Sequence, residues 1–250
     1  SDRYLIVNPF FHTFGYKAGF LACLLSGATM IPVPIFDVLT VLKIVNQEKI
    51  TALPGPPTLY LSILNHPERN NFDLSSLRLA VTGSAAVPVE MIRRMRQELT
   101  FTVILTAYGL TESTGTITMC RADDDPFTIS TTSGRAISDV EVRVVDQNNR
   151  EVARGTAGEI ICRGYNVMPG YFENPEATAQ AIDKDGFLHT GDIGIMDTNG
   201  YLAITDRIKD MFIVGGFNAY PADIENTLLA HPSIAQVAVV GQPDDRLGEV

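Results

Sequence analysis

Cysteine is scarce in this chain. The three cysteines, Cys23, Cys120 and Cys162, are isolated from one another, and the four histidines are scattered along the sequence. Neither residue type shows the paired spacing of a zinc site, so we do not expect a zinc centre. Isolated thiols in odd number fit a reducing compartment, which indicates a cytoplasmic protein.

Basic residues are also few. The chain has 19 Lys and Arg residues against 29 Asp and Glu residues, which gives a net charge of -10 at pH 7. This balance argues against nucleic acid and against an anionic membrane surface as partners. An anionic small molecule is still compatible with it where local cations or backbone N–H groups supply the attraction.

No uninterrupted apolar run is long enough to cross a membrane. The uncharged stretch from Ala18 to Phe36 approaches the required length of about 20 residues, but a Ser-Gly pair and two prolines interrupt it. We expect a buried helix that ends at Leu25 and then a buried strand over Thr29–Val33. No basic segment precedes this stretch, so the sequence shows no signal peptide.

The apolar content of 45% over 250 residues is sufficient for one large or two modest globular domains. Up to residue 106, strand patterns alternate with helix patterns. This alternation predicts an α/β fold in which right-handed crossovers build a mostly parallel βαβ sheet. Strands are expected at 4–7, 29–33, 50–53, 77–82 and 102–106, and helices at 16–25, 38–47 (with Asp37 as N-cap), 57–65 and 88–99.

After Gly134 the pattern changes to short strands joined by turns, which predicts a small antiparallel sheet or barrel. A helix from Pro221 and a strand over Ile234–Val240 then indicate the start of a small α+β unit. The strands of the middle part are expected at 140–145, 158–163, 192–196 and 201–205, and the three parts at residues 1–133, 134–206 and 207–250.

Ligands of a parallel sheet bind at the carboxyl ends of its strands. One predicted strand runs into the small residues Gly83–Ala86, against which a flat ligand could lie. The next strand runs into Tyr108–Ser113, where Tyr108 could stack on a base, Thr111 could donate to a phosphate oxygen and Glu112 could hold Mg²⁺. The alternative is a turn with an edge tyrosine and a Thr-x-Ser helix cap.

The stretch Asp185–Glu225 combines many glycines with charges set between apolar runs. Its pattern predicts two strands across a turn at Thr198–Gly200. A charged cluster over Asp206–Asp210 follows the second strand, and the pair Gly215-Gly216 comes next. This order indicates a hinge and a close approach of the backbone to a ligand, although a hairpin with a solvated charged edge is the simpler alternative.

Taken in order, these motifs resemble those of the adenylate-forming superfamily, which includes acyl-CoA synthetases, luciferases and the adenylation domains of peptide synthetases. The resemblance covers nearly the whole chain. Within the superfamily, the sequence is most similar to FadD-type acyl-CoA ligases, and among them to the actinobacterial group that activates an indanedione propionate from steroid ring degradation. The motifs are NPFFHTFGYKAG (8–19), GSAA (83–86), YGLTE (108–112), GYFENPEAT (170–178), DGFLHTGD (185–192) and DRIKDMFIVGGFNAYPADIE (206–225).

The resemblance implies a reaction in two steps that uses ATP, Mg²⁺ and coenzyme A. A carboxylate attacks the α-phosphate of ATP and forms an acyl adenylate and pyrophosphate, after which the thiol of coenzyme A displaces AMP. Charge develops first on phosphate oxygens and then on the acyl carbonyl, so positioning and electrostatic stabilisation should dominate catalysis.

By the same resemblance, Gly83, Ser84 and Ala85 line the adenine ring. Tyr108 stacks on this ring, and Gly109 belongs to the same nucleotide-binding loop.

The resemblance also implies that Thr111 contacts the α-phosphate and that Glu112 is the Mg²⁺ ligand. Asp192 accepts hydrogen bonds from both ribose hydroxyls, a task that suits the two oxygens of a carboxylate. Arg207 reaches the ribose and a phosphate.

Lys209 is implied to lie at the hinge between a large and a small domain. Gly215 and Gly216 are implied to border the channel of the pantetheine arm.

The aromatic loop is implied to form the acyl pocket, with Phe11 and Phe14 as walls and His12 as a movable gate. A packed loop histidine and core phenylalanines are the alternative. No Asp or Glu occurs from Tyr4 to Phe36. A buried substrate ammonium would need a carboxylate, so this absence favours an acid with an uncharged tail.

Two features of the family pattern are not found in the sequence: the Ser/Thr/Gly-rich phosphate loop and a late lysine of the small domain. We therefore expect that these 250 residues alone do not adenylate a substrate at a useful rate. Surface left uncovered would favour self-association or a homo-oligomer. A non-catalytic nucleotide-binding module and an adenylation domain that loads a carrier protein are the alternative functions.

Overall fold

The computed structural model describes residues 1–83, 87–207, 212–214, 217–219, 221–229, 231, 234, 237–244 and 248–250. The chain divides into two compact units. The first comprises Ser1–Val140 with Tyr165–Pro169, and the second comprises Glu141–Gly164 with Gly170–Val250. The expected division into three parts at residues 133 and 206 stays a prediction.

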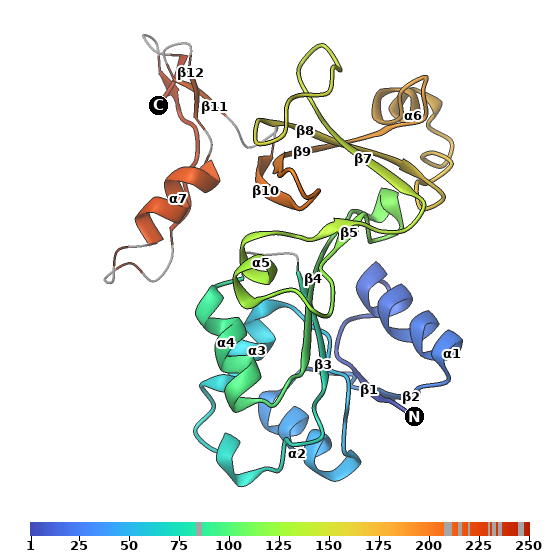
Figure 1. Ribbon diagram of the computed structural model, residues 1–250, viewed down its shortest axis with the longest axis vertical. Coiled ribbons are helices and arrows are strands. Elements are labelled where there is room, and N and C mark those ends of the chain that lie inside the picture. Colours follow the sequence, from blue (N-terminus) through green and yellow to red (C-terminus); the bar gives the residue numbers. More distant parts are fainter. Residues whose placement is uncertain are drawn as a thin grey trace. The chain divides into compact units, whose positions relative to one another are not determined.

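The first unit is built on one mainly parallel sheet, as the alternation of strand and helix patterns predicted (Figure 1). Strands β1 and β2 pair in parallel, and so do β3 and β4, whereas β5 and β6 add antiparallel pairs at the edge. The elements are β1 (Arg3–Ile6), η1 (Phe14–Leu21), α1 (Ala22–Ser26), β2 (Thr29–Pro32), α2 (Val38–Glu48), α3 (Pro57–Leu64), η2 (Arg69–Asn71), β3 (Leu79–Gly83), α4 (Val89–Glu98), β4 (Val103–Tyr108), η3 (Thr111–Ser113), β5 (Thr118–Met119), α5 (Pro126–Thr131) and β6 (Arg135–Ala136).

The segment predicted as a strand at 50–53 joins the two parallel pairs. Ala52 forms parallel bridges with Tyr4 of β1 and with Leu79 of β3. The N–H of Leu53 donates to the carbonyl of Leu79 at 3.0 Å, and the N–H of Thr51 donates to that of Arg3 at 2.9 Å. One continuous sheet therefore runs from β2 to β6.

Helices cover both faces of this sheet, with α3 and α4 on one side and η1 with α1 on the other (Figure 1). The predicted N-cap of α2 is confirmed, because the carboxylate of Asp37 accepts a hydrogen bond from the N–H of Thr40 at 2.8 Å. The core between α3 and the sheet contains Tyr60, which meets the ring of Phe101 edge-on at 5.9 Å and donates its hydroxyl to the carbonyl of Leu53 at 2.7 Å.

The helix predicted at 16–25 begins earlier and has two parts. Its first part, η1, is a π-helix, and α1 continues it to Ser26, where Gly27 at a φ of +67° ends the helix. The N–H of Tyr16 donates to the carbonyl of His12 at 2.9 Å, and Thr13 already has helical backbone angles. The aromatic loop thus leads directly into the helix, which the sequence pattern did not predict.

The second unit begins with a four-stranded sheet in the order β10-β9-β8-β7, in which β9 is antiparallel to both β8 and β10. The predicted turn between β9 and β10 is confirmed: Gly200 has a φ of +83°, and the Asp197 carboxylate accepts the N–H of Asn199 and of Tyr201, each at 2.8 Å. The elements are β7 (Val140–Val145), β8 (Ala157–Gly164), α6 (Pro175–Ala181), β9 (Leu188–Met196) and β10 (Leu202–Arg207).

The remaining described residues of this unit contain α7 (Pro221–Leu229) and four short strands. These strands are β11 (Phe212–Val214), β12 (Phe217–Ala219), β13 (Pro243–Asp244) and β14 (Gly248–Glu249), in the order β12-β11-β14-β13. The strand expected over Ile234–Val240 was wrong for the described residues of that range, none of which is in a strand. A strand is defined by a hydrogen-bonded neighbour, which the apolar pattern of a single segment does not provide.

Among the residues that the structure describes, no helix is both long enough and apolar enough to span a membrane.

Candidate functional site

The carboxyl ends of β3 and β4 lie side by side in the first unit. Thr82 pairs with Thr106 and Gly83 with Ala107 in the parallel register. A Cβ on Gly83 would lie 2.5 Å from the carbonyl oxygen of Ala107, so a glycine is required for this approach. The hydroxyl of Thr82 is buried and, within the described part of the chain, has no hydrogen-bond partner. The two strand ends singled out in the sequence are therefore adjacent.

The loop after β4 is a tight turn closed by its own backbone. Leu110 accepts hydrogen bonds at its carbonyl oxygen from the N–H of Ser113 (3.1 Å) and of Gly115 (2.7 Å). A Cβ on Gly109 would lie 2.6 Å from the carbonyl carbon of Gly115, so the two ends of the turn touch. Within the turn, Thr111 is exposed and Glu112 is half-buried, and both lie in the short helix η3.

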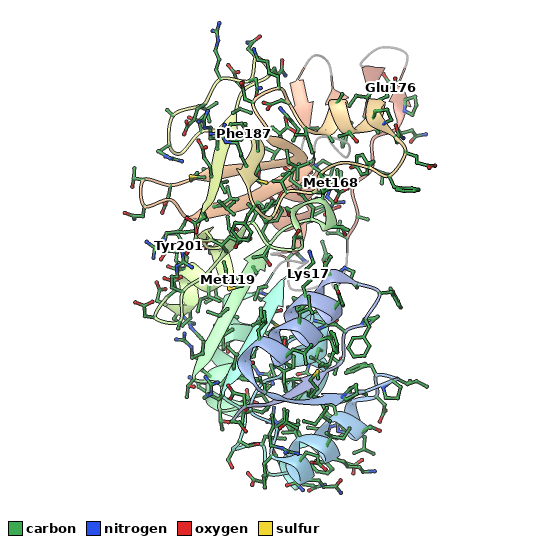
Figure 2. The ribbon with its side chains drawn as sticks, turned by 90° about the vertical axis from the view of Figure 1, so that its right-hand side faces the viewer. Lys17, Met119, Met168, Glu176, Phe187 and Tyr201 are labelled. Carbon is green, nitrogen blue, oxygen red and sulfur yellow. The ribbon has the colours of Figure 1, made fainter. Side chains whose placement is uncertain are left out.

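Residues 165–169 hold this loop from a distant part of the sequence (Figure 2 labels Met168). Asn166 is buried and donates its side-chain amide to the carbonyls of Ser113 (3.3 Å) and Thr116 (2.8 Å). The N–H of Met168 donates to the carbonyl of Glu112 at 2.8 Å. Sequence reasoning missed Asn166, because one asparagine in a turn-rich segment carries no signature of a contact some 50 residues away.

The aromatic loop lies next to the same turn. A Cβ on Gly115 would come 3.1 Å from the side chain of Thr13, so this threonine packs directly against the turn. His12 is exposed, and its Nδ1 accepts a hydrogen bond from the N–H of Phe14 at 3.1 Å. Phe11 is 94% exposed and Phe14 is half-buried. The sequence did not single out Thr13.

Asp192 and Arg207 form a pair across β9 and β10 in the second unit. Nε of Arg207 lies 3.1 Å from an oxygen of Asp192, and the two residues are opposite each other in the antiparallel register. The side chain of Asp192 is 5% exposed, whereas that of Arg207 is 66% exposed. A buried carboxylate is therefore held by a guanidinium that is still largely open to solvent.

Glu159 of β8 organises the residues just before Asp192. One of its oxygens lies 2.8 Å from Nδ1 of His189, and the other accepts the N–H of Gly191 at 3.1 Å. Gly191 has a φ of +72°, a conformation that favours glycine. Sequence reasoning missed Glu159; its only signal was a charged residue within a predicted strand, whose partner cannot be identified without the strand register.

The residues proposed from the sequence thus fall into two groups and a remainder. Those brought together in the first unit are Gly83, Tyr108, Gly109, Thr111 and Glu112, with Phe11, His12 and Phe14 on the neighbouring aromatic loop. The pair in the second unit is Asp192 and Arg207. Lying outside the described residues are Ser84, Ala85, Lys209, Gly215 and Gly216.

Comparison with curated proteins gives relatives that match the whole chain. It is 59% identical over 250 residues to the 3-[(3aS,4S,7aS)-7a-methyl-1,5-dioxo-octahydro-1H-inden-4-yl]propanoyl:CoA ligase of Rhodococcus jostii (strain RHA1), covering 100% of the chain and 46% of the relative. The protein of the same name from Mycobacterium tuberculosis is 57% identical over 250 residues, with 100% and 47% covered. The chain therefore spans about half the length of these curated relatives.

The fold of this chain is also found in solved structures. ATP-bound MatB from Rhodopseudomonas palustris superimposes with a TM-score of 0.89 at 33% identity, over 100% of this chain and 48% of that one. The o-succinylbenzoate CoA synthetase from Bacillus subtilis, in complex with an acyl-adenylate intermediate, superimposes with a TM-score of 0.87 at 30% identity, over 100% and 50%. Residues 1–172 match the family described as AMP-binding enzyme. Because this match covers more than half of the chain, the protein belongs to the AMP-binding enzyme family.

Proposed function

We propose that this chain carries the nucleotide- and acyl-binding part of an AMP-forming acyl-CoA ligase. In this reaction a carboxylate and ATP form an acyl adenylate and pyrophosphate, and the thiol of coenzyme A then displaces AMP. The observation that carries the proposal is the identity of 59% and 57%, over the whole chain, to two relatives named as CoA ligases.

In the first unit, the proposed nucleotide site is the edge where Gly83 adjoins the turn after β4. Tyr108 would stack on the adenine, with Gly83, Ser84 and Ala85 beside it. The close approach of Gly83 to Ala107 supports this role, since a flat base needs a surface without side chains. The buried hydroxyl of the adjacent Thr82, which has no hydrogen-bond partner among the described residues, is a further donor at this strand end.

Thr111 and Glu112 would face the phosphates. Thr111 is exposed, so its hydroxyl is able to donate to an α-phosphate oxygen. The described residues contain no cluster of three or more His, Cys, Asp or Glu placed to hold a metal ion. Mg²⁺ usually takes only one or two carboxylates and completes its shell with water and substrate phosphates, so Glu112 beside a triphosphate fits this ion. Mg²⁺ would neutralise phosphate charge when bound.

In the second unit, Asp192 and Arg207 would hold the ribose. The carboxylate of Asp192 can accept two adjacent hydroxyl donors, and its pair with Arg207 orients it without nucleotide. The exposed guanidinium of Arg207 is free of packing constraints over most of its surface and can reach a phosphate. Lys209 is proposed as a hinge residue, and Gly215 and Gly216 as the border of the pantetheine channel.

The acyl group would lie along the aromatic loop. Phe11 and Phe14 provide apolar surface, and His12 acts as the gate between acyl group and nucleotide. The exposure of His12 and Phe11 supports a role on a ligand, because rings of this kind are otherwise buried. For the acid we propose a ring-bearing propionate with an uncharged tail, like the dioxo-octahydroindenyl propanoyl group in the names of the two relatives. A steroid-derived acid, as the sequence motifs imply, has this character.

The test is an assay of the full-length gene product with ATP, Mg²⁺, coenzyme A and a panel of acids. The panel runs from short and long fatty acids to an indanedione propionate, and both AMP and acyl-CoA are quantified. Selective turnover of the ring-bearing acid supports the ligase and its substrate. Turnover of linear acids alone keeps the ligase and rejects the ring-bearing substrate. AMP release without acyl-CoA indicates a carrier protein as acceptor, and no AMP release with any acid leaves a nucleotide-binding module.

A further inference from the structure

Lys17 of the first unit forms no ion pair or hydrogen bond with the described residues. Lys17 is the single Lys or Arg between Tyr4 and Phe36, a stretch without Asp or Glu. It is half-buried, and within the described part of the chain its amine has neither an ion pair nor a hydrogen bond. Burial lowers the pKa of Lys17, and no charged neighbour offsets this effect. The ammonium of this partly buried lysine is therefore available to a hydrogen-bond acceptor from solvent or from a ligand.

The helix that carries Lys17 directs it away from the sheet. Gly15 and Gly19 of η1 are buried, and a Cβ on Gly19 would lie 3.2 Å from the side chain of Ile6 in β1. Gly19 therefore lies on the side of the helix that packs on the sheet, and Gly15 packs on the carbonyl oxygens of Asn8 and Pro9 in the preceding loop. Lys17 lies two positions from each of these glycines, which in a helix is nearly the opposite side.

The same side of the helix faces the candidate nucleotide turn. Thr13, at the start of η1, packs on Gly115 of that turn. Residues four or five apart lie on one side of a π-helical segment, and Lys17 follows Thr13 by four. Lys17 is thus in the first turn of η1, one turn from a residue that touches the turn after β4 (Figure 2).

A cluster of three aromatic rings lies on the side of the helix next to Lys17. The ring of Tyr16 stacks on that of Phe20 at 6.2 Å between centroids, and Phe10 meets Phe20 edge-on at 6.2 Å. Phe10 is 51% exposed and Tyr16 is 45% exposed, so the rings present apolar surface on the outside of the helix. An apolar surface with one ammonium on the adjoining side of the helix suits a hydrocarbon ring system with an oxygen acceptor at one point.

We propose that Lys17 is a specificity-determining residue whose ammonium donates a hydrogen bond to a ring ketone oxygen of the carboxylic acid substrate. This inference rests on the proposed function. A purely hydrocarbon tail would leave the ammonium unsatisfied, and an acid that carries its own ammonium would be repelled by it. A ketone oxygen accepts the hydrogen bond without adding charge to the pocket.

The experiment compares two acids on the full-length gene product. One is a propionate on an octahydroindene ring with two ketones, and the other is the same acid without the ketones. Wild type, Lys17→Met, Lys17→Arg and the control Lys43→Met, which alters an exposed lysine of α2, are assayed for kcat/KM and for the KM of ATP. Thermal melting checks that each variant folds.

Lys17→Met should lose about 10- to 100-fold in kcat/KM on the diketone, as expected for a hydrogen bond to a charged group. Its kcat/KM on the acid without ketones should not fall, because this acid makes no hydrogen bond to the ammonium, and its KM for ATP should change by less than about threefold, a smaller effect than one such hydrogen bond. Lys17→Arg, which retains the donor, should recover part of the loss, and Lys43→Met should behave as wild type.

An equal loss on both acids would overturn the inference, because Lys17 would then act on the reacting carboxylate or on the fold. Full activity of Lys17→Met on the diketone would also overturn it, while the proposed ligase would stand. Absence of AMP release from the wild type with every acid would overturn the proposed function and this inference together, so the two failures are distinguishable. If Lys17→Met does not fold, Lys17→Ala, which also lacks a donor, gives the same comparison between acids.

Discussion

At the scale of the residue, the candidate site depends on a few polar groups that are partly buried and held in pairs. Asp192 is the clearest case, since its carboxylate is 5% exposed and has Arg207 at 3.1 Å. Glu159 plays a supporting part, because it fixes both His189 and the N–H of Gly191, the residue before Asp192. Such groups are more sensitive to the loss of charge than to a change of size.

Replacement of Asp192 by Asn should weaken AMP binding by about 10- to 100-fold, because an amide offers a single acceptor where the carboxylate offers two charged oxygens. The measurement is a calorimetric titration with AMP. Asp185→Asn, a change at an exposed carboxylate of the same unit, should leave the affinity unaltered. An unchanged affinity of Asp192→Asn in a folded protein would contradict the proposed ribose contact.

At the scale of the element, turns and strand ends are held by contacts that leave little space. Gly134 illustrates this: its φ is +79°, and a Cβ there would lie 1.9 Å from the carbonyl carbon of Met119 in β5. Gly27 has a similar φ of +67°, but a Cβ there would meet nothing within 4 Å. A side chain would therefore strain the backbone at both positions, but it would collide with neighbouring atoms only at Gly134.

Gly134→Ala should therefore destabilise the protein by about 3 kcal/mol or more, because the methyl group must displace backbone. Gly27→Ala should cost only about 1–2 kcal/mol, the strain of a left-handed alanine. Urea unfolding of both variants measures the difference. Equal costs would show that β5 moves to make room at Gly134.

A carboxylate connects the amino ends of three neighbouring strands. Asp2, just before β1, accepts the Thr51 hydroxyl at 2.8 Å and is held by Arg78 through both oxygens at 2.9 and 2.8 Å. The hydrogen bond from Arg78 and then that from Thr51 lower the pKa of Asp2 below its usual 3.8. The stabilisation is therefore present above pH 3.8 and is lost as the pH falls through the lowered pKa.

Asp2→Asn should reduce stability by about 1 kcal/mol or less at neutral pH, since the pair is well exposed. The difference from wild type should disappear in acid. Urea midpoints recorded from neutral pH downward measure this, with Asp123→Asn, an exposed carboxylate, as the control. A difference that persists below the lowered pKa would mean that the charge of Asp2 is not its cause.

At the scale of the whole molecule, the reactivity of the three thiols can be used to follow the opening of the two compact units. Cys23 and Cys120 lie in the first unit and Cys162 in the second, and each is buried. Burial raises the pKa of Cys162 to about 12 and also raises the pKa of Cys23 and Cys120. Thiolates are the reactive form, so all three cysteines should be inert in the native state.

Iodoacetamide should accordingly modify none of the three cysteines in the native protein near pH 8. An accessible thiol, with a pKa of about 8.5, is partly ionised at this pH and would react. In concentrated guanidinium chloride all three should react. Mass spectrometry at intermediate denaturant then shows whether Cys162 becomes reactive before or together with the other two. Rapid native labelling of any cysteine would mean that its unit opens locally at low cost.

The sequence by itself determined features that depend on neighbours along the chain. The strand–helix alternation, the Asp37 cap and the turn at Gly200 were predicted because each depends on propensity, on a local hydrogen bond or on a glycine conformation. The motifs also led to the family, because their residues and their order can be read directly from the sequence. The tertiary structure alone decided which residues meet: Thr13 with Gly115, Asn166 with Ser113, and Glu159 with His189. These contacts join segments that are distant in sequence, and strand register and packing, which no short pattern encodes, bring them together.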